Sequence, residues 1–254
     1  MTLQVLVAAI DQTDFSLVKK MNIRTAAIVG NQGSRNAVET TEAEGHTVTY
    51  LNFAERGVGL NRNNALMRAD ADICLLADDD MVYDDDYEAK VLEAFRQYPE
   101  ADVIFFNLEE ENSTRYRIDS PHKVGRLNFL RYGAARTAFR LDRIRENGIF
   151  FNQCFGGGCR YSHGEDSIFF SDCLRKGLRL MAVPVTIGRL THERASTWLG
   201  RYDETYLRDQ GALYRQISRR FWRLLCLQDA LRKRKRYGLA PLRAYRLMTK
   251  GAGR

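Results

Sequence analysis

Short apolar runs alternate with helical stretches along the first half of the chain, and this alternation limits the possible folds more than any other feature. Each run has four to eight residues and is rich in Val, Ile, Leu or Phe, as in a strand buried on both faces. The expected strands are 3–10, 25–30, 46–52, 73–76 and 103–107, and the expected helices are 16–21, 61–69 and 84–98. The pattern predicts an α/β domain of the nucleotide-binding type, with a parallel sheet flanked by helices.

The second half is less regular. We expect a strand at 137–141 and a short helix that ends at 147–148. Three consecutive glycines, 156–158, must form a loop because glycine weakens both helices and strands. A helix at 165–176 should end at Gly177, and a strand should follow at 179–185.

The positive charge is concentrated at the C-terminus. Of the 254 residues, which give a formal net charge of +7, residues 207–254 contain 14 Lys or Arg and two acids, a balance of +12. The first 206 residues therefore have a balance of −5. Apolar residues in the basic segment recur three and four apart, so we expect an amphipathic helix from about 206 to 236.

Composition excludes several classes of protein. With 44% hydrophobic and 28% charged residues, the chain is neither disordered nor collagen-like. Five cysteines without a Cys-x-x-Cys pair indicate reduced packing residues rather than a disulfide framework or a zinc ribbon. No apolar run approaches the length of a membrane span, and the first residues lack the features of a signal peptide, so we expect a cytoplasmic protein.

The most informative segment is an apolar run, 73–77, that ends in Asp78, Asp79 and Asp80. Adjacent carboxylates repel one another, and ligands of α/β sheets bind at the carboxyl ends of parallel strands. A cation there would neutralise the cluster. Asp78 and Asp80 lie two apart and face the same side of an extended chain, and their hard oxygens suit Mn²⁺ or Mg²⁺. The alternative is an ordinary acidic turn.

Two blocks give the chain a resemblance to a known family. Residues 59–65, Gly-Leu-Asn-Arg-Asn-Asn-Ala, followed by a helix and then by the three aspartates, resemble the nucleotide-sugar-binding half of family 2 glycosyltransferases, which have the GT-A fold. Gly164-Glu165-Asp166 at the start of a helix resembles the acceptor-side motif of that family. The resemblance covers about residues 3–195. It implies a GT-A domain at 1–205, an α/β fold with a Rossmann-like, mixed and mainly parallel sheet flanked by helices. This domain would have a nucleotide-sugar half at 1–108 and an acceptor half at 109–205, and a basic helical extension would follow at 206–254.

On the donor side the resemblance implies roles for individual residues. Asp80 would bind the divalent metal, and Asp78 would reach the ribose or the waters of the metal. Arg62 would contact the nucleotide, and Ala8, Asp11 and Asp79 would also lie at the donor. The family often has an aspartate where this chain has Asn31, whose amide carbonyl could still accept a hydrogen bond from uracil. His192 is similar in placement to a histidine that contacts the metal or the diphosphate in some members, or it is an ordinary loop residue.

On the acceptor side, Asp166 would be the general base, and Glu165 would position the acceptor or orient the loop. Phe155, Gly157, Gly158 and Tyr161 come just before these acids. Aromatic rings stack on sugars and glycines permit close approach, so we expect an acceptor site there; the aromatic residues could instead belong to the core.

The resemblance implies an inverting enzyme that transfers a hexosyl or N-acetylhexosaminyl group. The donor would be a nucleoside diphosphate sugar, with UDP as the default, and the acceptor a hydroxyl of a glycan or lipid-linked saccharide. The basic extension suits an anionic membrane at the inner face of the plasma membrane, or it packs on the catalytic domain.

Two other functions fit less of the sequence. A sugar-phosphate nucleotidyltransferase would have a glycine-rich, basic loop after the first strand, and residues 8–13 are not such a loop. Binding of nucleic acid through the basic run 232–236 would leave the acidic cluster and the second block unused, so we expect no nucleic-acid partner.

Overall fold

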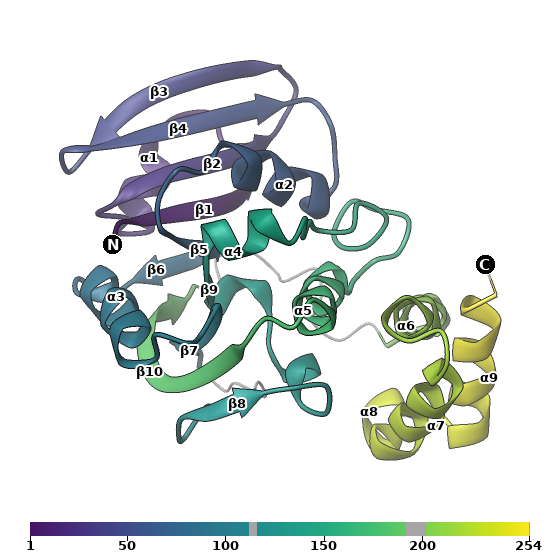
Figure 1. The fold of residues 1–254 in the computed structure, drawn as a ribbon. Coiled ribbons are helices and arrows are strands. Elements are labelled where there is room, and N and C mark those ends of the chain that lie inside the picture. Colours follow the sequence, from purple (N-terminus) through teal and green to yellow (C-terminus); the bar gives the residue numbers. More distant parts are fainter. Residues whose placement is uncertain (112–115, 192–201, 254) are drawn as a thin grey trace.

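The computed structural model describes residues 1–111, 116–191 and 202–253, and its centre is one mixed sheet (Figure 1). In the described residues the strand order is β3-β4-β2-β1-β5-β9-β7-β10-β6, and β8 pairs with β10. The strands are β1 (Leu3–Ile10), β2 (Ala26–Gln32), β3 (Ala37–Ala43), β4 (His46–Phe53), β5 (Ile73–Asp78), β6 (Met81–Tyr83), β7 (Val103–Glu109), β8 (His122–Val124), β9 (Thr137–Arg140) and β10 (Leu180–Leu190).

The sheet has a parallel half and a mixed half. Strands β4, β2, β1 and β5 are parallel neighbours, as the apolar runs predict. Beyond them β9 runs antiparallel between β5 and β7, while β10 is parallel to β7. The prediction of an α/β mixed sheet is confirmed. Sequence patterns missed β3, a polar edge strand, and β6 and β8, which have three residues each.

Both faces of the sheet are covered, so the central strand is apolar throughout. Ile73, Leu75 and Ala77 of β5 join one core cluster, and Cys74 and Leu76 join the cluster on the other face. The first cluster contains side chains of α1 (Ser16–Lys20) and α3 (Tyr87–Gln97). The second contains side chains of α2 (Val58–Arg68), α4 (Leu141–Glu146) and α5 (Glu165–Arg175).

The basic segment does not form one helix. It forms α6 (Glu204–Ile217), α7 (Trp222–Arg232), α8 (Arg234–Tyr237) and α9 (Pro241–Gly251), grouped beside α5 in Figure 1. The prediction of a continuous helix over 206–236 is wrong because the backbone turns extended at Ser218. The four helices have a core of their own, and α6 approaches α9 so closely that a Cβ at Gly211 would lie 1.8 Å from the carbonyl oxygen of Met248.

Two sequence expectations concern single residues and spans. Cys74, Cys173 and Cys226 are buried as expected, but Cys154 is exposed and is not a packing residue. Across 1–111, 116–191 and 202–253, no helix combines the length and apolarity needed to cross a membrane.

Candidate active site

A cavity of about 560 Å³ lies at the carboxyl ends of β1 and β5. From the first half of the chain it is lined by residues that include Ala8, Gln32, Arg56, Asn61, Arg62 and the three aspartates. From the second half it is lined by Gly133, Gly157, Gly158 and residues 163–167. The wall also includes Tyr206, Gln210, Leu213 and Tyr214 of α6 and Lys233 at the end of α7. The fold thus brings the two sequence blocks and the C-terminal helices to one cavity.

The three aspartates are held at the end of β5. Asp78 is in register with Ala8 of β1, and its Oδ1 accepts a hydrogen bond from Arg62 Nη2 over 2.7 Å. Asp79 Oδ2 accepts from the backbone N–H of Ile10 over 3.2 Å. The carbonyl of Asp80 accepts from the N–H of Thr191 over 2.7 Å. All three carboxylates belong to residues that line the cavity.

These carboxylates fit a hard divalent cation as part of a shared coordination shell. Among the residues that the structure describes, no three His, Cys, Asp or Glu side chains are arranged to hold a metal ion by themselves. Mg²⁺ and Mn²⁺ are usually bound by one or two carboxylates together with substrate phosphates, so two carboxylates such as those of Asp78 and Asp80 would be enough from the protein. His192, the third expected ligand, lies outside the described residues.

Arg62 joins the aspartate cluster to the acids at the start of α5. Its guanidinium is buried and donates to Asp78 and, over 2.8 Å through Nη1, to Glu165 Oε1. Burial alone would lower the pKa of Arg62, but the carboxylates of Asp78 and Glu165 outweigh that effect and raise it. The guanidinium carbon also lies 5.5 Å from the centre of the Phe151 ring. Arg62 is therefore a fixed cation between the two acidic groups.

Asp166 lines the cavity with a raised pKa. Loss of hydration and the neighbouring Glu165 carboxylate raise the pKa of the Asp166 carboxyl to about 7, although Arg62 acts to lower it. Asp166 Oδ1 accepts from the N–H of Ser167 over 2.6 Å, which fixes the side chain at the start of α5. A carboxyl that titrates near neutral pH is suited to accept a proton.

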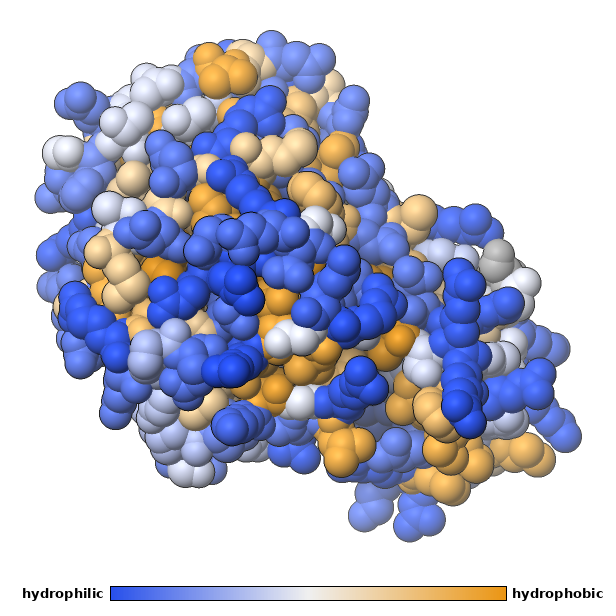
Figure 2. Space-filling model, in the orientation of Figure 1, coloured by the Kyte–Doolittle hydropathy of each residue, from blue (hydrophilic) through white to orange (hydrophobic). Residues whose placement is uncertain are grey.

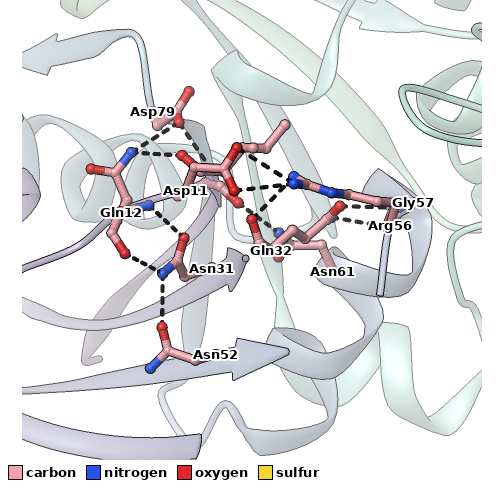
Figure 3. Close-up of polar contacts among 11 residues, drawn as sticks. Asp11, Gln12, Asn31, Gln32, Asn52, Arg56, Gly57, Asn61 and Asp79 are labelled. Carbon is pink, nitrogen blue, oxygen red and sulfur yellow. Dashed lines mark hydrogen bonds and ion pairs between the residues drawn. The ribbon is translucent and has the colours of Figure 1, made fainter. Parts of the chain in front are cut away.

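Other residues expected at the donor form a polar network beside the cavity (Figure 3). Asn31 is buried and is not among the wall residues: its Oδ1 accepts from the N–H of Gln12, and its Nδ2 donates to Asn52 Oδ1 over 2.7 Å. Asp11 forms an ion pair of 3.0 Å with Arg56, which does line the wall. Gln32 and Arg56, which sequence reasoning missed, lie closer to the cavity than Asn31 and Asp11 do.

The aromatic residues that were expected at the acceptor site do not line the cavity. Phe155 is buried and stacks on Tyr161 with ring centres 4.5 Å apart, and neither residue is among those lining the cavity. Phe155 packs in a small core with Ala212 and Leu213 of α6. Their position makes them packing residues of the interface with the C-terminal helices. Gly157 and Gly158, in contrast, do line the cavity.

Comparison with known proteins identifies the family. The model of glycosyl transferase family 2 matches residues 3–164. The chain belongs to glycosyl transferase family 2. It is a glycosyltransferase that moves a sugar from a nucleotide-sugar, which excludes the nucleotidyltransferase interpretation. No curated protein matches the sequence.

Solved structures share the GT-A fold at low sequence identity. TarS 1-349 of S. aureus in complex with UDP-GlcNAc is 14% identical with a TM-score of 0.61, and the match covers 98% of this chain and 91% of that one. The same protein with UDP matches at 14% identity and a TM-score of 0.60, covering 99% and 70%. The mannosyltransferase PcManGT of Pyrobaculum calidifontis, in complex with GDP-Man and Mn²⁺, is 13% identical with a TM-score of 0.52, covering 97% and 73%.

In this family 2 glycosyltransferase the first sequence block is a structural hub. Asn61 Nδ2 donates to the carbonyl of Gly30 over 2.7 Å, and a Cβ at Gly30 would lie 1.9 Å from Asn61 Oδ1. Asn63 makes two hydrogen bonds, of 2.9 and 2.8 Å, with the backbone of Phe151 in the second half. With Arg62 between them, these amides fix α2 to the sheet and to the segment around Phe151.

The C-terminal helices contact the residues just before the second block, which sequence reasoning did not predict. Ser162 donates to Asp209 Oδ2 over 2.8 Å, and His163 Nε2 lies 2.9 Å from Gln210 Oε1. His163 also stacks on Tyr206, and burial lowers the pKa of its imidazole. No local pattern identifies these contacts, because they join residues about fifty positions apart.

Proposed function

We propose that this enzyme is an inverting transferase that uses a UDP-sugar, with Asp166 as the general base. The observation that supports this most is the position of Asp166 on the wall of the cavity that also contains the aspartate cluster, together with its raised pKa. The transferred group would be a hexosyl or N-acetylhexosaminyl residue. UDP is favoured over GDP because the matching TarS complexes contain UDP or UDP-GlcNAc, at the higher TM-scores.

On the donor side, Asp80 and Asp78 would hold Mn²⁺ or Mg²⁺ with the diphosphate. When bound, the cation stabilises the negative charge that develops on the leaving diphosphate. A distant relative of this fold is a complex with Mn²⁺, which supports the choice of ion. Arg62 fixes Asp78 in place, and Asp79 holds the end of β1 through the N–H of Ile10.

On the acceptor side, the Asp166 carboxylate would take the proton of the attacking hydroxyl. Glu165 is tied to Arg62, so its role would be to orient the start of α5 rather than to accept the proton. The acceptor would be a glycan or a lipid-linked saccharide that reaches the cavity beside Gly157 and Gly158. We further propose that the enzyme is cytoplasmic and associates with the inner face of the plasma membrane through its basic C-terminal helices.

The first test is a thermal-shift comparison of UDP-, GDP- and dTDP-sugars, each with and without Mn²⁺. We expect a UDP-sugar with Mn²⁺ to raise the melting temperature most, since a ligand that binds the native state stabilises it. A larger shift with a GDP-sugar would reject UDP.

The second test replaces the base. The Asp166→Asn enzyme should lose transfer and still be stabilised by the same donor. Loss of donor binding in that variant would show that Asp166 belongs to the donor site.

A further inference from the structure

Helix α7 has large apolar side chains on the side that faces away from the protein. Leu224, Leu227 and Leu231 are 61%, 44% and 54% exposed, and Phe221, just before the helix, is 54% exposed. Their spacing of three, three and four residues puts them on one side of a helix. Leu242, at the start of α9, is 59% exposed. We call these five residues the leucine ridge.

The ridge is not needed to fill the core of the helical bundle. The inward side of α7 consists of Cys226, Asp229 and Ala230, which are buried against the other C-terminal helices. Figure 2 shows apolar side chains on the surface over the region of α7 and α9. Exposed apolar side chains gathered in one place on a folded protein indicate a binding surface.

The segment 218–253, which contains the ridge, is rich in exposed bases and has no exposed acid of its own; the half-exposed Glu204 of α6 pairs with Arg243, next to Leu242. The exposed bases nearest in sequence are Arg219, Arg220, Arg223, Arg232, Arg234, Lys235 and Arg236. The only acid in the sequence between 218 and 254 is Asp229, which is buried and accepts hydrogen bonds from Lys233 Nζ and the Tyr237 hydroxyl. A surface of leucines with a basic rim complements one in which apolar chains lie beneath negative headgroups.

We propose that the leucine ridge inserts into the headgroup region of an anionic bilayer while the surrounding bases contact the lipid phosphates. This deepens the membrane association proposed above and identifies the surface responsible. It differs from binding through the bases alone in that the apolar residues supply much of the affinity. Nucleic acid would use the bases but would leave the leucines in water.

The ridge also orients the active site. Lys233 directly follows α7 and lines the catalytic cavity, so the end of the membrane-facing helix is part of the cavity wall. Docking of α7 would bring the cavity close to the bilayer surface. That position suits an acceptor hydroxyl on a saccharide whose lipid remains in the membrane.

The test is flotation of the full chain with vesicles of phosphatidylcholine and phosphatidylglycerol in equal parts, and with vesicles of phosphatidylcholine alone. The ridge variant is Leu224→Gln, Leu227→Gln and Leu231→Gln. We expect its partition coefficient to fall about tenfold for each leucine. The rim variant is Arg220→Gln, Arg223→Gln and Arg232→Gln. Its partition coefficient should fall about fivefold for each base, and only on the anionic vesicles.

A matched control replaces exposed apolar residues elsewhere. Val38→Gln and Met67→Gln alter side chains that are 68% and 56% exposed on β3 and α2, and this variant should float like the unmodified protein. Flotation of the ridge variant equal to that of the unmodified protein would overturn insertion. So would failure of the unmodified protein to float.

Other occupants of the ridge give distinct results. If the unmodified chain is a dimer without lipid and the ridge variant is a monomer, the ridge binds a second copy, and the proposal is overturned. Binding of single-stranded DNA by the unmodified chain and the ridge variant alike, without flotation, would likewise overturn it. Stabilisation of each variant by a UDP-sugar with Mn²⁺ reports separately on the donor site, so failure of the proposed function is distinguishable from failure of the ridge.

Discussion

The ion pairs of Arg62 permit a quantitative test of how the two halves of the active site are joined. In the Arg62→Met variant the side chain is shorter and uncharged, so the guanidinium over Phe151 is lost and Glu165, which is 7% exposed, loses its buried cation. Removing one partner of a buried ion pair costs about 3 to 5 kcal/mol. Asp78 contributes less to this cost because its side chain is 40% exposed.

The reverse change should cost less. In the Glu165→Gln variant Arg62 keeps its ion pair with Asp78, so we expect the free energy of unfolding to fall by only about 1 to 2 kcal/mol. In the double variant no uncompensated carboxylate remains at position 165. The loss should therefore be smaller than the sum of the single losses, with an interaction energy of about 2 kcal/mol.

The assay is urea unfolding of the unmodified protein and the three variants at pH 8. The same variants should shift the pH dependence of transfer in opposite directions. Arg62 lowers the pKa of Asp166 and Glu165 raises it, so the acid limb should move to higher pH in Arg62→Met and to lower pH in Glu165→Gln. The network would be refuted if the losses of stability were additive. It would also be refuted if the acid limb moved in the same direction in both single variants.

Three further predictions concern single positions. Because the pKa of Asp166 is raised to about 7, the folded protein binds more protons than the unfolded chain between about pH 4 and pH 7. This group therefore makes the free energy of unfolding fall as pH rises through that window. In the Asp166→Asn variant, urea unfolding should show a smaller fall. The Asp80→Ala enzyme should lose the Mn²⁺-dependent part of donor binding, and undiminished binding in a calorimetric titration would contradict the metal assignment. The backbone of Gly164 has φ +105°, and in Gly164→Ala the new Cβ would lie 2.6 Å from Leu213. We expect thermal unfolding to show a loss of about 2 to 4 kcal/mol in the free energy of unfolding. The control Gly177→Ala has φ +83° but no atom within 4 Å of its Cβ, and should lose only about 1 kcal/mol; equal losses would show that contact with α6 is unimportant.

The sequence by itself predicted the parallel half of the sheet and the elements that end at the active site. Apolar runs and acids at strand ends are local features, so the residue pattern alone assigned Asp78 and Asp80 to one ligand site, whereas Asp166 was assigned there only by the family resemblance; all three line the same cavity. Burial of β5 on both faces follows from its unbroken apolar sequence.

Only the tertiary structure decided which residues meet. Arg62 and Glu165 are 103 positions apart, so no local sequence pattern predicts that they form an ion pair. The sequence left open whether the aromatic residues before Asp166 belong to a sugar site or to the core, and Phe155 packs in a core with α6. The basic segment was expected as one helix because its apolar spacing is helical, whereas packing at Gly211 and Gly251 folds it into a bundle that lines the cavity. A sequence pattern shows that a side chain is buried or exposed; the partner it meets depends on how the whole chain folds.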